Sequence, residues 1–260
     1  MSSSHPHARS AVTRAIALAA AAAVTTALGL VATAAPAVAA AVPTIVNPAS
    51  SDWGQPDTRA GGTLEFTDEF GAPAGFGDGA LGMSTDGKTT AKVTFFTAQD
   101  AGLPLSDLET VSYSSYRSSA SSGNPIQIPT AQFYLDPDGG GPLTFAPLVF
   151  EPYYSYGNPT NDTWQSWDGM GTVQWWSNRA IGDIPAFSYV PLADFQAAAP
   201  DAIITAYGFN LGSGNPGIIA AVDALRSTTR RSTSRPSTAS WSTTTAWAPP
   251  PTATTPIRPT

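Results

Sequence analysis

The chain has 260 residues, a formal net charge of −7, two histidines and no cysteine. Both histidines, His5 and His7, lie within the first 40 residues, so the rest of the chain offers neither an imidazole nor a thiol. This composition excludes Ser-His-Asp triads, Cys-His pairs and zinc or haem sites of the His/Cys type beyond residue 40. Between residues 41 and 225, nineteen acidic residues outnumber five basic ones, which argues against nucleic acid or an anionic membrane as a partner.

The N-terminal segment has the pattern of a secretory signal peptide. Arg9 and Arg14 precede an apolar, alanine-rich run that ends at Ala37-Val38-Ala39, the small-x-small pattern of a cleavage site. A membrane anchor is the alternative, because the run is long enough to span a bilayer. We interpret residues 1–40 as a cleaved signal peptide. We therefore expect an exported, extracellular protein, with cell-wall association left open.

Residues 41–60 are expected to form an extended approach segment, and residues 61–226 a β domain. Short apolar stretches alternate there with clusters of Gly, Pro, Asn, Asp and Ser, which is typical of strands and turns. The expected strands are residues 63–67, 80–85, 92–97, 110–116, 131–135, 143–151, 163–168, 172–176, 202–211 and 218–225. Only residues 191–199 have a helical pattern, and a proline at each end keeps that helix short. The pattern predicts an all-β, two-sheet antiparallel β-sandwich of jelly-roll type with one short helix.

Residues 227–260 form a tail rich in Ser, Thr, Pro and Arg. The tail has too few apolar residues to offset the entropy cost of ordering, so we predict that it is disordered. One functional interpretation is an O-glycosylated stalk. The alternative is a frameshift in the coding sequence, because every acidic residue disappears after Asp223 and Ser-Thr pairs recur.

Four of the seven tryptophans lie between residues 161 and 178. Side chains on a strand point alternately to its two faces. Trp175 and Trp176 are adjacent, and Trp164 and Trp167 are three residues apart, so each pair is split between opposite faces if the segments are strands. We expect one tryptophan of each pair to enter the core and the other to point outward.

Outward aromatic rings on a secreted sheet favour a carbohydrate-binding surface, because the apolar faces of sugar rings pack on Trp and Tyr. Either Trp164 or Trp167, and either Trp175 or Trp176, is the expected stacking residue. Tyr153, Tyr154 and Tyr156 precede the cluster and are expected to flank the ligand. The alternative is that these rings fill sandwich corners or lie under loops or a neighbouring domain.

Asp136 and Asp138 stand before three glycines in the stretch YLDPDGGGPL. Carboxylates at positions i and i+2 of a tight loop can converge on a calcium ion, which would be structural here. The favoured interpretation is a hairpin turn that uses Asp-Gly chemistry.

Catalysis by the expected β domain would depend on carboxylates, and a glycosidase needs two of them. Glu65, Glu69 and Glu151 are candidates, but no paired-carboxylate signature is present. We therefore expect no catalytic residues, and a carboxylate-only glycoside hydrolase remains the less favoured alternative.

Residues 198–226, AAPDAIITAYGFNLGSGNPGIIAAVDALR, resemble the closing hairpin of secreted actinobacterial β-sandwich proteins without an assigned activity. The segment is also similar to the last strands of jelly-roll carbohydrate-binding and concanavalin-like modules. The stretches TVSYSSY and FAPLVFEPYY fit earlier strands of the same actinobacterial group. The resemblance covers residues 60–226 and implies a sandwich fold, in which Asp223 is structural, and a further strand where the tail stands. It supplies no catalytic residues.

These observations predict a secreted, monomeric, noncatalytic domain that binds polysaccharide or a cell-surface glycan through exposed aromatic rings. A cell-surface adhesin or a structural domain of the envelope is the alternative from another class. In that alternative the aromatic rings would be covered.

Overall fold

The computed structural model describes residues 43–44, 46–141, 145–229 and 242–243. The predicted signal peptide lies outside these residues, as does nearly all of the predicted disordered tail. Within the described ranges, no helix has the length and apolar character needed to cross a bilayer.

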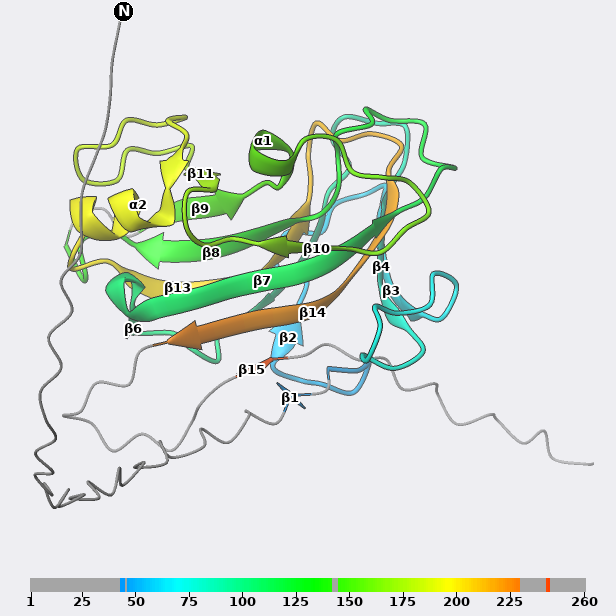
Figure 1. The fold of residues 1–260 in the computed structure, drawn as a ribbon, viewed down its shortest axis with the longest axis horizontal. Helices are drawn as coiled ribbons and strands as arrows, with labels where there is room; N and C mark the ends of the chain where they lie inside the picture. The colour runs from blue at the N-terminus through cyan, green and yellow to red at the C-terminus, as the bar shows by residue number, and fades with distance from the viewer. Residues whose placement is uncertain (1–42, 45, 142–144, 230–241, 244–260) are drawn as a thin grey trace, which may run out of the picture. The chain divides into compact units, whose positions relative to one another are not determined.

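Two antiparallel sheets form a β-sandwich, as the sequence predicted (Figure 1). The larger sheet has the order β12-β11-β9-β8-β13-β5-β2, with β6 paired to β13. Its strands are Val190–Pro191, Gln174–Trp176, Ala146–Phe150, Thr130–Asp136, Ile203–Leu211, Val93–Thr97, Trp53–Gly54 and, for β6, Leu103–Pro104. The smaller sheet has the order β10-β7-β14-β4-β3, with strands Gln165–Asp168, Leu108–Arg117, Ile219–Thr229, Ala80–Thr85 and Gly62–Thr67.

The remaining elements are short. The two-residue strands β1 (Pro43–Thr44) and β15 (Ser242–Thr243) pair in parallel. A 3₁₀ turn, η1, covers Leu105–Asp107. Helix α2 (Leu192–Ala198) is the predicted helix, and it buries Leu192 and Phe195. A one-turn helix that the sequence analysis missed, α1 (Tyr153–Tyr156), follows β9.

Alternation along each strand divides its side chains between the core and the outer surface. On β8, Phe133 and Leu135 enter the core, whereas Gln132 and Tyr134 lie on the outer face of the larger sheet. The core is rich in large aromatic side chains: Trp53, Phe95, Tyr113, Phe133, Phe150, Trp167, Trp175, Tyr207 and Phe209. A chain without cysteine depends on this apolar contact between the two sheets for its stability.

Trp175 is the largest side chain in the core that is fully buried. Its ring stacks on Phe150 with centroids 5.2 Å apart and tilts against Phe133 at 5.9 Å. The indole Nε1 donates a hydrogen bond of 2.7 Å to the carbonyl oxygen of Gly169, so the one polar atom of the ring is satisfied.

The structure departs from the predicted domain limits at both ends. Val46 and Trp53 belong to the hydrophobic core, and Trp53 also lies in edge strand β2, so part of the expected approach segment packs on the sandwich. At the other end β14 continues to Thr229 and pairs with β7, three residues beyond the predicted limit. Trp53 is buried because β2 pairs with β5, and the sequence around Trp53 gives no sign of this pairing.

A buried arginine holds the loop after β7. The Arg117 guanidinium donates to the carbonyl oxygens of Gln127, Gly123 and Asn124, and to Oδ1 of Asn161 at 2.8 Å. Arg117 is almost fully buried, and this burial lowers its pKa. Carbonyl and amide oxygens therefore replace the water that an exposed guanidinium would bind.

Asp223 is a fully buried carboxylate in the middle of β14. Its Oδ1 accepts a 2.6 Å hydrogen bond from the backbone N–H of Ala224, a residue with a φ of 55° at a bulge in the pairing of β14 with β7. Its Oδ2 has no hydrogen-bond partner among the described residues. Burial raises the pKa of Asp223 from 3.8 to about 7, because desolvation disfavours the charged form.

We predict that Asp223 makes the protein less stable as the pH rises. The folded state keeps the proton that the unfolded chain has already lost, so the free energy of unfolding should fall between about pH 4 and pH 7 and then level off. The contribution is up to about 4 kcal/mol, from roughly three pKa units at 1.36 kcal/mol each. Urea unfolding at several pH values measures it. In Asp223→Asn the free energy of unfolding should change less between about pH 4 and pH 7. An unchanged pH dependence in the variant would show that Asp223 is not its cause.

Candidate functional site

A groove of about 400 Å³ lies on the outer face of the larger sheet. Its floor crosses β11, β9, β8 and β13, which contribute Trp176, Val149, Gln132 and Asn210. Three interstrand spacings of about 4.8 Å each make this floor about 14 Å wide. Regular strands, rather than loops alone, therefore fix the spacing of the side chains that line the groove.

Trp176 forms one end of the groove and belongs to a cluster of exposed aromatic rings. Its ring stacks on Phe187 with centroids 6.0 Å apart, and Tyr189 lies 6.3 Å away. Tyr189 contacts Tyr154, with centroids 4.3 Å apart and a 3.0 Å hydrogen bond between the hydroxyl groups. Tyr153 follows at 5.4 Å from Tyr154. Phe187 is 61% exposed, so this cluster offers apolar ring surface to solvent.

Glu151 holds the Trp176 indole in place. The Nε1 atom of Trp176 donates a 3.2 Å hydrogen bond to Oε2 of Glu151. Burial raises the pKa of the Glu151 carboxyl, and the hydrogen bond from Trp176 opposes that shift. The indole is therefore oriented by a polar partner at its edge, while the ring stacks on Phe187 and lines the groove.

A second row of rings crosses the sheet on the other side of the groove. Tyr134 packs edge-on against Phe145 at 5.1 Å and stacks on Phe96 at 4.4 Å. Phe96 and Tyr134 project from β5 and β8, which lie on either side of β13. The β13 residues between them are Ala206 and Gly208, whose small size lets the two rings meet above the strand. A shallow apolar hollow next to Tyr134 and Phe96 extends the surface.

The groove between the two sets of rings is lined by amide and hydroxyl groups. Gln132 donates from Nε2 to the Thr130 hydroxyl at 3.2 Å, and that hydroxyl donates to the carbonyl oxygen of Asn210 at 3.2 Å. Asn178 and Asn215 add two further side-chain amides to the lining. Amides both donate and accept hydrogen bonds, as sugar hydroxyl groups do, so this lining can pair with a polyol.

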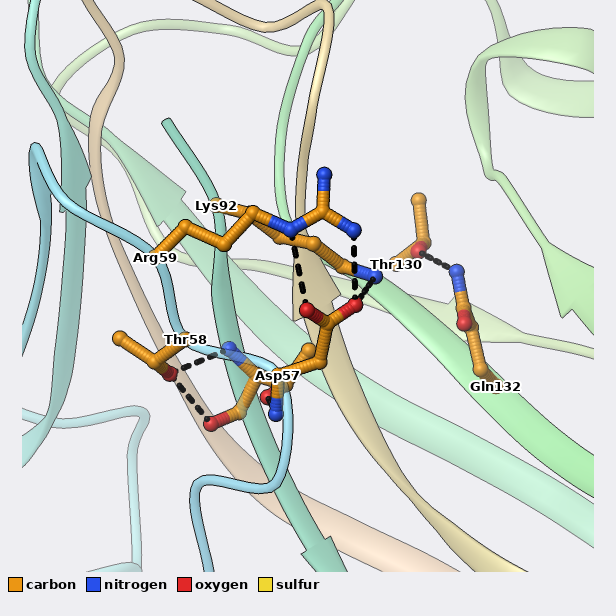
Figure 2. Close-up of polar contacts among 7 residues, drawn as sticks. Asp57, Thr58, Arg59, Lys92, Thr130 and Gln132 are labelled. Atoms are coloured by element: carbon orange, nitrogen blue, oxygen red, sulfur yellow. Dashed lines mark hydrogen bonds and ion pairs between the residues drawn. The ribbon is translucent and has the colours of Figure 1, made fainter. Parts of the chain in front are cut away.

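Asp57 closes the end of the groove opposite Trp176 and bonds to two cations (Figure 2). Arg59 reaches its carboxylate with Nε at 2.9 Å and Nη2 at 3.0 Å, and Lys92 Nζ lies 2.6 Å from Oδ2. These contacts lower the pKa of Asp57 from 3.8 to about 2, with the Arg59 hydrogen bond as the largest cause and Lys92 next. The Lys92 side chain is mostly buried, whereas those of Arg59 and Asp57 are well exposed.

The structure splits both tryptophan pairs between buried and more exposed positions. Trp175 is in the core and Trp176 lines the groove. Trp167 is buried, with its Nε1 donating to the Ser115 hydroxyl at 2.8 Å. Trp164 is half-buried, and its Nε1 donates to the carbonyl oxygen of Phe70 at 2.9 Å.

Trp164 and Tyr156 do not join the groove. Trp164 packs against Tyr116 of β7, on the smaller sheet, at a centroid distance of 5.9 Å. The Tyr156 ring lies 5.5 Å from Trp167, and its hydroxyl donates to the carbonyl oxygen of Asp168 at 2.7 Å. Of the seven aromatic residues that the sequence singled out, only Trp176, Tyr154 and Tyr153 therefore belong to the aromatic cluster beside the groove.

The three candidate glutamates lie on two different surfaces. Glu151 lines the groove. Glu65 and Glu69 line a separate hollow beside β3 and β14 of the smaller sheet, together with Phe70 and Ile219. Glu65 and Glu69 therefore share one hollow, whereas Glu151 lies apart from them in the groove.

Asp136 acts as a turn residue at the end of β8. Its Oδ2 accepts a 2.9 Å hydrogen bond from the backbone N–H of Gly140, and its Oδ1 accepts one of 3.3 Å from that of Asp138. Gly139 and Gly140 have φ values of 61° and 105°, which favour glycine. This is the role that the hairpin interpretation assigns to Asp136. No cluster of three or more potential metal-ligating side chains of the His, Cys, Asp or Glu type occurs in the ranges that the structure describes.

Several groove residues were not singled out from the sequence, namely Asp57, Lys92, Gln132, Tyr134, Phe145, Asn178, Asn210, Phe187 and Tyr189. They come from segments far apart in the chain. Only Gln132, Tyr134 and Asn210 among them lie on strands, and on β8 Gln132 and Tyr134 alternate with the apolar residues Phe133 and Leu135. That alternation could have predicted an outward-facing polar and aromatic surface on β8, but not its neighbours.

Comparison of the chain with known protein families, curated proteins and solved structures gives no match.

The two adjacent tryptophans of β11 should differ sharply in their contribution to stability. Trp175→Ala removes a fully buried ring and should lower the free energy of unfolding by about 3–5 kcal/mol. Trp176→Ala removes a half-buried ring and should cost about 1 kcal/mol. Chemical denaturation followed by circular dichroism measures both values. Equal losses would contradict the split between core and groove.

Proposed function

We propose that this protein is a secreted, noncatalytic domain that binds polysaccharide in the groove on the outer face of the larger sheet. The observation that carries the proposal is the combination of Trp176 with a row of amide side chains, including Gln132, in one groove. Aromatic faces supply apolar contact for sugar rings, and amides supply hydrogen bonds for their hydroxyl groups.

The shape of the site favours a polymer over a small ligand. The floor crosses four strands, and it is continued on one side by the apolar hollow beside Tyr134 and Phe96 and on the other by the Phe187 and Tyr189 rings. A chain of sugar units lying across the strands would contact each of these groups in turn. A single sugar would contact only some of them.

Export and extracellular action remain part of the proposal. They are supported by the residue pattern of the first 40 positions. We propose that the domain acts as a monomer at the cell surface or in its surroundings, where its ligand would be a wall or environmental polysaccharide.

Trp176→Ala should weaken binding to the polysaccharide that is recognised by about tenfold or more, which corresponds to about 1.4 kcal/mol. The experiment is a pull-down of the purified protein on insoluble cell wall, cellulose, chitin and xylan, with tryptophan fluorescence read in parallel. Trp164→Ala is the matched control, because Trp164 is also half-buried but lies with the smaller sheet. Its affinity should remain close to that of the unchanged protein.

Two outcomes would contradict the proposal. If the folded protein is retained on none of the polymers, the adhesin or structural role takes its place. If Trp164→Ala abolishes retention and Trp176→Ala does not, the binding surface lies on the smaller sheet instead. Release of soluble sugar from a retained polymer would indicate a hydrolase, and Glu151→Gln would then be the first variant to assay.

A further inference from the structure

At one end of the groove, the two positive charges of Lys92 and Arg59 exceed the single negative charge of the Asp57 carboxylate that they contact. Asp57 bonds to both Lys92 and Arg59, so one negative charge stands against two positive ones (Figure 2). The Lys92 side chain lines the groove. This end of the groove therefore carries a net charge of about +1 in a body that is strongly acidic.

The basic residues of the domain are concentrated around this one groove. Residues 46–229 contain six Lys or Arg side chains, of which three border it: Arg59, Lys92 and Arg179. The Arg179 guanidinium lies 5.8 Å from the ring centroid of Phe145, a groove-lining residue. Of the other three, Arg117 is buried under its loop, Lys88 pairs with Asp86, and Arg226 lies on β14 of the smaller sheet.

The acidic surface elsewhere does not cancel this local charge. Interactions between exposed charges are largely screened beyond about 8 Å at physiological ionic strength, so a ligand in the groove responds mainly to the groups that line it. Asp57 is already paired, and Glu151 lies beside Trp176 at the opposite end. An anionic group placed beside Lys92 would meet donors from Lys92 and, at the rim, from Arg59.

We propose that the polysaccharide bound in this groove is acidic, with a carboxylate or phosphate group held at the Lys92 end while sugar rings pack on the aromatic residues. This inference rests on the proposed function and adds the charge class of the ligand to it. The anionic group accepts hydrogen bonds from Lys92 Nζ without displacing Asp57, because an ammonium has three donors.

The test compares acidic polymers with neutral ones. Polygalacturonate and its carboxyl-reduced derivative, which share a backbone, form one arm, and wall teichoic acid and a neutral wall glycan form the other. The unchanged protein should prefer the acidic polymer in at least one arm by about threefold to tenfold at 0.15 M ionic strength. The arm in which the preference appears identifies the anionic group as carboxylate or phosphate.

A series of charge variants makes the test specific to this site. Lys92→Gln and Arg59→Gln each leave Asp57 with one cation, so each should remove most of the preference. Asp57→Asn leaves both cations unopposed and should increase the preference. Lys88→Gln is the control, because it removes an equal charge from an exposed side chain outside the groove, and it should behave like the unchanged protein.

Binding that depends on Trp176 but is equal for acidic and neutral polymers would overturn this inference and leave the proposed function standing. A preference that survives unchanged in both Lys92→Gln and Arg59→Gln would overturn it as well. If the folded, unchanged protein binds neither the acidic nor the neutral polymers, the result contradicts the proposed function itself. Circular dichroism of each variant establishes that a changed preference does not reflect unfolding.

Discussion

The contact between the two sheets is the constraint on which the rest of this structure depends. Large aromatic side chains fill the space between the sheets, and no disulfide assists them. Because strand residues alternate between faces, burying Phe133, Leu135 and Trp175 forces Gln132, Tyr134 and Trp176 onto the outer face. The groove is therefore a geometric consequence of the same register that builds the core. The elements that support it, β8, β9 and β13, lie in the interior of the larger sheet.

Much of this arrangement could be read from the sequence, and the limits of that reading have physical causes. The strand containing Phe133 and Tyr134 and the helix at Leu192 were predictable because periodicity and proline are local signals. The one-turn helix at Tyr153 has no such signal, since a single turn is too short to show a period of 3.6 residues. Alternation predicted that Trp175 and Trp176 would be separated, but strand pairing decides which of them faces the core.

The site itself depended on contacts that no local pattern records. Asp57 and Lys92 are 35 residues apart in sequence and meet only because the segment before β3 crosses beside β5. Phe145 meets Tyr134 across a hairpin, and Phe96 meets Tyr134 across the small residues of β13. The aromatic residues at one end of the groove cluster along the chain and could be predicted from the sequence. The charged end could not, because Arg59 lies two residues from Asp57 but nothing in the sequence indicates that Lys92 joins them.

The larger sheet has core-facing positions and outward-facing positions, and substitutions at the two have different evolutionary consequences. A substitution at Phe133, Leu148 or Trp175 alters the packing between the sheets and is limited by folding. A substitution at Gln132, Val149 or Trp176 alters the outer surface and leaves the packing of the opposite face in place. A lineage could therefore exchange the proposed polysaccharide ligand of this surface through a few replacements at alternate positions. The scaffold would be inherited unchanged while its specificity diverged.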